Sequence, residues 1–427
     1  MVFKFQYDLK QITINNQIYI LDPLDLEVFH LHSKDDIDTL YKNIILNKRK
    51  KIKIKPKYTF DEKNTDINTI SLDISHGCTL KCKYCYLSAG YHKKEKMSKD
   101  FFLKILNFLN KDKKHDITFY FAGEGEPTLN KPLIMQIPKL CRDNGFNKCH
   151  FEITTNGTLL TQDLIKFLEK EKFAISVSLD GDEKNNSNRI FINGNPSFSK
   201  VIENITLLKK TKIKFACKAT ITPDNKDLLQ MFRFFEDNEF PFFHGFATKS
   251  FDGQYIPKIS DVRNNLKLQF DTLIDYYVKR IKDNKYIYAR KIIDDIKRIK
   301  YRSVSYTGCS AGINSFYINM KGEIYVCSSH NSCQELCVGN ISEGIDYEKI
   351  IKQNYYPKDV NSYSKCKYCW MRYLCSGGCL AAKWLETKTT TNTSEYQCIL
   401  NSIYWEAIIK IFIQISPYIK GNINFKK

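Results

Sequence analysis

The chain has 427 residues, of which 43% are hydrophobic and 26% are charged, and its formal net charge is +19. This length exceeds what one ordinary hydrophobic core holds, so we expect two or three domains of a soluble globular protein. No apolar run has the length of a membrane span, and the first residues resemble neither a signal peptide nor a lipidation motif, which predicts a cytoplasmic protein without a membrane partner.

The positive charge is densest over residues 48–55. A basic run of this kind can form a nucleic-acid groove. Basic residues are spread along the whole chain, however, and no RNA-binding signature accompanies the run. We therefore interpret the run as a solvated surface and do not expect a nucleic-acid partner.

Residues 1–68 are predicted to form a small α+β unit. Two alternating stretches, 11–14 and 17–21, flank Asn15-Asn16 and favour a hairpin, and a third short strand is expected over 28–31. A helix near residues 35–47 would close the unit, and a basic linker would follow it.

From residue 69 onward, predicted strands and helices alternate. Helix-like periodicity covers stretches such as 100–110, 164–171 and 198–210, each long enough for a crossover between parallel strands. This alternation predicts an α/β fold over 69–260, either a partial (β/α)6 TIM-like barrel or a doubly wound sheet, with the chemistry at the carboxyl ends of the strands. The expected strands are 71–75, 117–121, 150–154, 173–179, 214–222 and 242–247.

A helical connector is expected over 261–300, followed by a Cys-rich unit over 301–427. The chain has 15 cysteines, and in a reducing cytoplasm so many thiols point to metal binding, because disulfides do not persist there. Three lie within residues 78–85 and nine in the last third, while Cys141, Cys149 and Cys217 are isolated and are expected to be ordinary buried thiols.

The first group, Cys78-x3-Cys82-x2-Cys85, follows the first expected barrel strand. Three thiolates on one loop can bind three irons of a cubane cluster and leave the fourth iron open. Structural zinc is the alternative, but it normally takes four ligands, and no fourth Cys or His has a usual spacing. The loop therefore favours an iron–sulfur cluster.

This spacing, with Tyr84 before the last cysteine, resembles the signature of the radical S-adenosylmethionine (radical SAM) superfamily. The stretch 122–127 agrees, because it ends the second strand where the family has a glycine-rich motif. The resemblance implies S-adenosylmethionine as cofactor, a SAM-binding 4Fe–4S cluster and a 5′-deoxyadenosyl radical. It also implies cofactor or substrate contacts at Tyr84, Gly123, Gly125, Glu126, Asn156, Ser178, Asp180 and Lys218.

Each of these contacts also has a structural explanation. The glycine-rich stretch could be a strand-to-helix turn, and Asn156-Gly157 has the composition of a tight turn. Asp180 could cap a helix, and Lys218 could simply lie on a strand face. The family likeness of the neighbouring cysteine loop favours the cofactor interpretation.

The C-terminal unit contains seven cysteines in a spaced pattern. A zinc ribbon could use the same pairs, but the pattern resembles the SPASM extension, which holds two auxiliary 4Fe–4S clusters. The resemblance implies one ligand set of Cys309, Cys327 and Cys379 and another of Cys366, Cys369, Cys375 and Cys398.

The first of these sets is one thiol short. Ser303 stands where some family members have an additional cysteine, so the first auxiliary cluster is expected to have an open iron. Cys333 and Cys337 could fill this position, or could be redox-active, and we favour plain packing thiols.

Family members with this extension mostly modify peptides and proteins. We therefore expect an enzyme that modifies a ribosomally made peptide, most simply by a thioether crosslink, with a flavodoxin- or ferredoxin-type electron donor. Epimerisation, carbon–carbon crosslinking and sulfatase maturation are alternatives, and Ser328 counts against the last because that branch has an aspartate there. Residues 1–68 either bind a leader peptide as an edge strand or serve as a packing extension. A zinc-dependent nucleic-acid- or partner-binding protein is the alternative outside the enzymes.

Overall fold

The computed structural model describes residues 9–32, 36–40, 42, 45, 67–110, 116–223, 225, 227–250, 252–253, 255–331 and 333–419. The basic run at 48–55 and the expected linker lie outside these ranges. Of the helix expected over 35–47, the structure has α1 (Asp36–Leu40).

The N-terminal unit contains the expected hairpin and third strand. Strands β1 (Lys10–Ile14), β2 (Gln17–Asp22) and β3 (Glu27–Leu31) form an antiparallel sheet in that order. Asn15 and Asn16 both have positive φ, 47° and 61°. A two-residue hairpin turn needs this conformation, which asparagine tolerates better than most residues, so the turn was predictable from the sequence.

The central sheet begins with six parallel strands, and all six expected strands are present. They are β4 (Thr69–Leu72), β7 (Thr118–Phe121), β8 (His150–Thr155), β9 (Ala174–Ser178), β10 (Lys214–Ile221) and β11 (Phe242–Phe246). Each is paired in parallel with the next in chain order. The prediction of a partial TIM-like barrel is confirmed.

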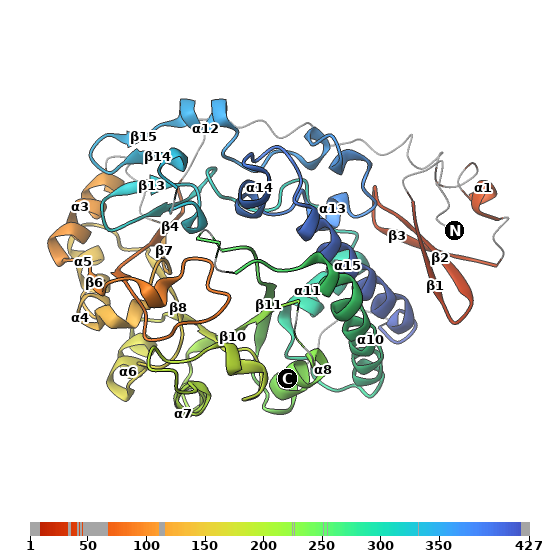
Figure 1. Ribbon diagram of the computed structural model, residues 1–427, viewed down its shortest axis with the longest axis horizontal. Helices are drawn as coiled ribbons and strands as arrows, with labels where there is room; N and C mark the ends of the chain where they lie inside the picture. The colour runs from red at the N-terminus through yellow and green to blue at the C-terminus, as the bar shows by residue number, and fades with distance from the viewer. Residues whose placement is uncertain are drawn as a thin grey trace.

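Helices on the outside of the sheet connect these strands (Figure 1). The three expected helical stretches are confirmed as α3 (Lys99–Asn110), α6 (Gln162–Lys170) and α7 (Phe198–Lys209), whose apolar residues face the core as the periodicity predicted. The connecting helices are α3 (Lys99–Asn110), α4 (Lys131–Ile134), α5 (Ile137–Asp143), α6 (Gln162–Lys170), α7 (Phe198–Lys209) and α8 (Leu228–Asp237).

The Cys-rich unit continues the same sheet. Strand β12 (Ser315–Ile318) pairs in parallel with β4, so a segment more than 240 residues later in the chain closes this side of the barrel. Three antiparallel strands then extend the sheet, namely β13 (Glu323–Tyr325), β14 (Cys337–Asn340) and β15 (Gly344–Ile345). The chain boundary expected at residue 301 is therefore not a break in the sheet.

The remaining elements connect or cover these strands. The connector over 261–300 contains α10 (Lys267–Lys282) and α11 (Arg290–Lys300). The short elements are β5 (Ser75–His76), β6 (Glu95–Lys96), α9 (Ile259–Asp261), α12 (Tyr347–Gln353), α13 (Arg372–Cys375) and α14 (Leu380–Thr387).

Helix α15 (Glu395–Ile415) corrects one expectation. In length and composition it could cross a membrane, although no such segment was expected. Half of its most apolar window is buried inside the protein, and it packs on α10 and α11. We therefore interpret α15 as a core helix, whose apolar character is explained by its burial within the fold.

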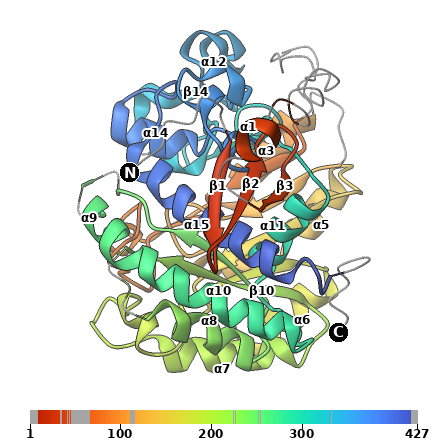
Figure 2. The same cartoon turned by 90° about the vertical axis from the view of Figure 1, so that its right-hand side faces the viewer.

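The N-terminal sheet lies beside α15 (Figure 2). The Lys10 ammonium lies 2.7 Å from a carboxylate oxygen of Glu406 on this helix. Arg302, which follows α11, pairs with Asp25 and Glu27 of the N-terminal unit. The N-terminal unit is therefore attached to the C-terminal half of the chain, through residues that lie far from it in the sequence.

Candidate radical and cluster sites

A cavity of about 390 Å³ opens at the carboxyl ends of the barrel strands. This is the place where barrels of this kind carry their chemistry. Its lining includes the three cysteines of the first group and seven of the eight predicted contacts, Asp180 being the exception. The lining residues from these predictions are Cys78, Cys82, Tyr84, Cys85, Gly123, Gly125, Glu126, Asn156, Ser178 and Lys218.

The cysteine loop is held by hydrogen bonds to its sulfur atoms. The Cys78 sulfur accepts from the backbone N–H of Leu80 at 3.4 Å and from the Asn156 side-chain amide at 3.3 Å. Burial raises the pKa of Cys78 to about 11 and that of Cys82 to about 12. Both thiols are therefore protonated at neutral pH, so binding of a metal cluster has to displace their protons.

Gly125 packs the glycine-rich stretch against the cysteine loop. A Cβ atom at this position would lie 2.3 Å from the carbonyl oxygen of Ser75 and 2.4 Å from that of Gly77. The neighbouring backbone N–H of Glu126 donates to the Gly77 carbonyl at 2.9 Å. The glycine is thus required by contact between two protein loops, in addition to any approach to a cofactor.

Glu126 connects the ends of two strands. Its buried carboxylate accepts from the Thr155 hydroxyl and the backbone N–H of Asn156, both at 2.6 Å, and from the backbone N–H of Thr128 at 3.1 Å. Burial raises the pKa of Glu126, and these hydrogen bonds oppose the rise. The carboxylate therefore fixes the loops around the cavity, and its predicted contact with the cofactor stays a prediction.

Asp180 lies behind the cavity and positions a residue that the sequence analysis did not identify. Its carboxylate accepts from Arg189 Nε at 2.9 Å, from Arg189 Nη2 at 3.2 Å and from the backbone N–H of Thr220 at 2.8 Å. The Tyr84 hydroxyl also donates to it. Arg189 lines the cavity and reaches Cys82, with 3.9 Å between Nη1 and the sulfur.

Arg189 carried no signal in the sequence. It follows a 3-10 turn over Asn185–Asn188 and belongs to no recognisable motif. Its partner Asp180 was predicted as a cofactor or substrate contact or a helix cap, and not as the partner of a buried cation. A buried carboxylate such as Asp180 needs a cation as its partner. The sequence does not indicate which of the 66 Lys and Arg residues is that partner.

Lys218 and Ser178 face each other on neighbouring strands. They are partners in the parallel register of β9 and β10, and both line the cavity. The Lys218 ammonium lies 3.3 Å from the Tyr120 hydroxyl, and its side chain is exposed. A cation is therefore available at the cavity wall, and its contact with an anionic group of a ligand stays a prediction.

The C-terminal cysteines form two groups in space. Burial raises the pKa of Cys309 and of Cys327, and the nearby Cys379 adds to the rise in both. For Cys375, burial and then the charges of Cys369, Cys398 and Cys366 raise the pKa to about 12. The two groups coincide with the two predicted ligand sets, whose binding of clusters stays a prediction.

Lys383 lies between the two groups, and the sequence analysis did not identify it. It is 2% exposed, and its ammonium is 3.4 Å from the centre of the Tyr363 ring. Burial lowers its pKa, while the charges of cysteines from both groups raise it. A buried cation among thiols stabilises their anionic, metal-binding form.

The spacing of the thiols counts against zinc. A tetrahedral zinc ion with Zn–S distances of about 2.3 Å holds its sulfurs about 3.8 Å apart. Within the described part of the chain, the only group of three or more Cys, His, Asp or Glu ligand atoms that all lie within 4.8 Å consists of Asp73, His76 and Glu124. Among the described residues, no three cysteine thiols lie within this spacing of one another.

The other cysteines have protein partners of their own. The Cys333 thiol donates to Glu335 and the Cys337 thiol to the carbonyl of Gly339, each at 3.2 Å. Cys141 and Cys217 are fully buried, and Cys149 is half-buried. These contacts support packing roles for Cys333 and Cys337.

Comparison with known proteins agrees with this geometry. The cysteine-type anaerobic sulfatase-maturating enzyme of Clostridium novyi is 25% identical over 368 residues, which cover 79% of this chain and 94% of that enzyme. The solved structure of native anSMEcpe with bound AdoMet has a TM-score of 0.69 at 23% identity and covers 82% of this chain and 100% of its own. Streptococcus suis SuiB bound to its precursor peptide SuiA has a TM-score of 0.53 at 17% identity and covers 91% of this chain and 98% of its own.

The fold and the three-thiol cavity define an α/β-barrel enzyme with its chemistry at the barrel mouth. Residues 72–234 match the family model of the Radical SAM superfamily. This part of the chain is a radical SAM domain, which indicates an enzyme that uses S-adenosylmethionine and a 4Fe–4S cluster.

Proposed function

We propose that Cys78, Cys82 and Cys85 hold the 4Fe–4S cluster of the radical reaction and that S-adenosylmethionine binds in the adjoining cavity. The donor set fits, because three thiols of one loop line the cavity and the side chains of Asn156 and Arg189 donate hydrogen bonds to the sulfurs of Cys78 and Cys82. When bound, this cluster and cofactor supply a 5′-deoxyadenosyl radical. Lys218 would bind the carboxylate of the methionine moiety.

We further propose that the substrate is a ribosomally made peptide or protein and that the product is a thioether. The relatives support a polypeptide substrate, since one is a sulfatase-maturating enzyme and another binds a precursor peptide. The observation that supports the thioether is a group of three thiols, Cys309, Cys327 and Cys379, which no fourth cysteine joins among the described residues. The thiols of Cys333 and Cys337 are hydrogen-bonded elsewhere. A cluster held by three cysteines has one iron free to bind a substrate thiolate.

The thioether reaction balances in atoms and electrons. A hydrogen atom leaves a substrate carbon and forms 5′-deoxyadenosine, and the thiol releases its proton. Formation of the carbon–sulfur bond then releases one electron, which balances the electron that started the reaction. The product is lighter than the substrate by two hydrogens.

The length of the SuiB match supports a leader-binding role for the N-terminal unit. Residues 69–427 are 359 of the 427 residues, or 84% of the chain. A match over 91% of the chain must therefore include part of residues 1–68. We propose that the sheet of β1, β2 and β3 receives a leader peptide at an exposed edge.

The test is anaerobic incubation of the reconstituted enzyme with a Cys-containing precursor peptide encoded beside its gene, followed by mass spectrometry. We expect a loss of about 2 Da that maps to a fragment containing the cysteine. The cysteine should also become resistant to alkylation. A peptide with unchanged mass and an alkylatable cysteine would contradict the proposal.

Sulfatase maturation is the second candidate, and the Clostridium novyi relative favours it. Conversion of cysteine to formylglycine lowers the mass by about 18 Da, which distinguishes it from a thioether. Against it, Ser328 follows Cys327 and hydrogen-bonds the Tyr86 hydroxyl, so no carboxylate stands there as a base. The same mass spectrum decides between the two reactions.

A further inference from the structure

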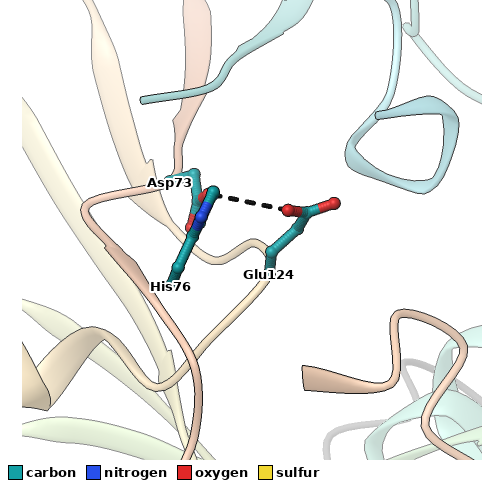
Figure 3. A group of neighbouring side chains, drawn as sticks. All are labelled: Asp73, His76 and Glu124. Atoms are coloured by element: carbon teal, nitrogen blue, oxygen red, sulfur yellow. Dashed lines mark ion pairs between the residues drawn. The ribbon is translucent and has the colours of Figure 1, made fainter. Parts of the chain in front are cut away.

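A second cluster of possible metal ligands lies outside the radical cavity. Asp73 follows β4, His76 is in β5, and Glu124 is in the glycine-rich stretch after β7 (Figure 3). The His76 Nε2 atom is 2.6 Å from an oxygen of Asp73 and 3.4 Å from an oxygen of Glu124. The three ligand atoms all lie within 4.8 Å of one another, and none of these residues lines the radical cavity.

Three polar atoms of this cluster are buried from solvent, namely Asp73 Oδ2, His76 Nε2 and the hydroxyl of Tyr317. Apart from the Asp73–His76 ion pair, they have no hydrogen bond of regular geometry. Tyr317 is 0% exposed, and its hydroxyl faces Asp73 from β12. Buried polar atoms normally have partners, so four side chains converge on a point where a ligand would satisfy them.

The charges of the cluster are also unbalanced. Asp73 is 2% exposed and Glu124 is 7% exposed. Among the described residues neither carboxylate has a Lys or Arg within ion-pair distance, although the chain has 66 such residues, and His76 is their common partner. Buried carboxylates are costly without a counter-charge, and a single imidazole cannot neutralise both.

We propose that Asp73, His76 and Glu124 bind one divalent transition-metal ion, with the Tyr317 hydroxyl beside it. One imidazole nitrogen and two carboxylate oxygens suit Mn²⁺ or Zn²⁺. Gly123 allows the glycine-rich stretch to approach Asp73 closely, because a Cβ atom on Gly123 would lie 2.8 Å from Asp73 Oδ1.

The ion would have a defined role in the barrel. His76 is two residues before Cys78, and Glu124 is in the stretch that packs on the cysteine loop through Gly125. A metal bound to both would fix the cysteine loop and the glycine-rich stretch relative to β4. The proposed metal site would therefore stabilise the loops that form the radical cavity, without contacting the cofactor.

The test is a titration of the fully reconstituted iron–sulfur enzyme with Mn²⁺, in which loss of the signal of free Mn²⁺ in electron paramagnetic resonance measures binding. We expect one saturable site in the wild type, at least about tenfold weaker binding in Glu124→Gln, and unchanged binding in Glu95→Gln. Glu95 is the matched control, because it pairs with His76 in the β5–β6 register but is exposed and outside the ligand group.

Two measurements keep the result decisive. Iron content and circular dichroism of Glu124→Gln should equal those of the wild type, which excludes a folding defect. Electron spin echo modulation of bound Mn²⁺ in the wild type should show the nitrogen of an imidazole. Absence of a saturable site, absence of nitrogen coupling, or equal binding in Glu124→Gln would each overturn the proposal and leave a purely structural ion-pair triad.

Discussion

In the barrel, the thiols of Cys78, Cys82 and Cys85 come from a single loop of eight residues, whereas the C-terminal thiols come from segments spread between residues 309 and 398. The first set needs only a local turn to converge. The second set needs β12 and β13, the turn before α13 and the first turns of α15 to pack together. Local spacing therefore predicts the first site, while the second depends on the whole C-terminal fold.

The two regions also stabilise their thiols by different means. The barrel loop receives an amide from Asn156 at the end of β8 and a guanidinium from Arg189 in the connection between β9 and α7. The C-terminal groups share one buried cation, Lys383. Changes in the barrel should thus affect radical formation, and changes in the C-terminal region should affect what happens afterwards.

The largest effect is expected when all three barrel cysteines are replaced. Cys78→Ala, Cys82→Ala, Cys85→Ala should abolish formation of 5′-deoxyadenosine and lower the iron content from about twelve to about eight per chain. Iron and sulfide analysis with product chromatography measures both. Cys333→Ala is the control and should change neither, and residual 5′-deoxyadenosine in the triple variant would contradict the assignment.

The converse replacement separates the two regions. In Cys366→Ala, Cys369→Ala we expect about eight irons per chain, continued formation of 5′-deoxyadenosine, and loss of the modified peptide. Iron analysis and mass spectrometry of the same reaction provide the two readouts. If the iron content stays near twelve, these cysteines do not hold an auxiliary cluster.

The buried ion pair behind the radical cavity should dominate the stability of the barrel. Asp180→Asn leaves the Arg189 charge buried and without its partner, so we expect the free energy of unfolding to fall by about 3–5 kcal/mol in urea denaturation. The exposed pair of Lys200 and Glu203 is the matched control, and Glu203→Gln should cost at most about 1 kcal/mol. Equal losses in the two variants would show that Arg189 is not held by this pair.

Lys383 offers a smaller test of the C-terminal region. Lys383→Met removes a buried cation beside both thiol groups, so the reduction potentials of any clusters there should become more negative while radical formation is unchanged. A redox titration followed by electron paramagnetic resonance measures the shift. Lys388→Met, just beyond α14, is the control, and unchanged potentials in Lys383→Met would remove Lys383 from the cluster environment.

The smallest effect is expected at the contact between the N-terminal sheet and α15. Lys10→Met with Arg302→Met breaks partly exposed ion pairs and should cost about 1 kcal/mol or less in stability. If the sheet binds a leader peptide, KM for the full precursor should rise while KM for a peptide without its leader does not. Equal changes for both peptides would favour a packing role for the N-terminal unit.

Much of the fold could be read from the sequence because it is encoded locally. The Asn15-Asn16 turn, the six parallel strands and the alternating helices follow from turn chemistry and periodicity over short windows. The cysteine loop is local as well. Its spacing gave the cofactor class, which the comparison with the Radical SAM superfamily confirms.

The rest depended on contacts between distant segments. The pairing of β12 with β4, the place of Arg189 beside Cys82, and the convergence of Asp73, His76 and Glu124 leave no trace in local spacing. The sequence analysis did not identify α15 as an apolar helix long enough to span a membrane, because polar residues interrupt its apolar run. By itself, the sequence determined the elements and the radical loop. Only the tertiary structure decided which charges are buried together, because burial brings together side chains that periodicity does not relate.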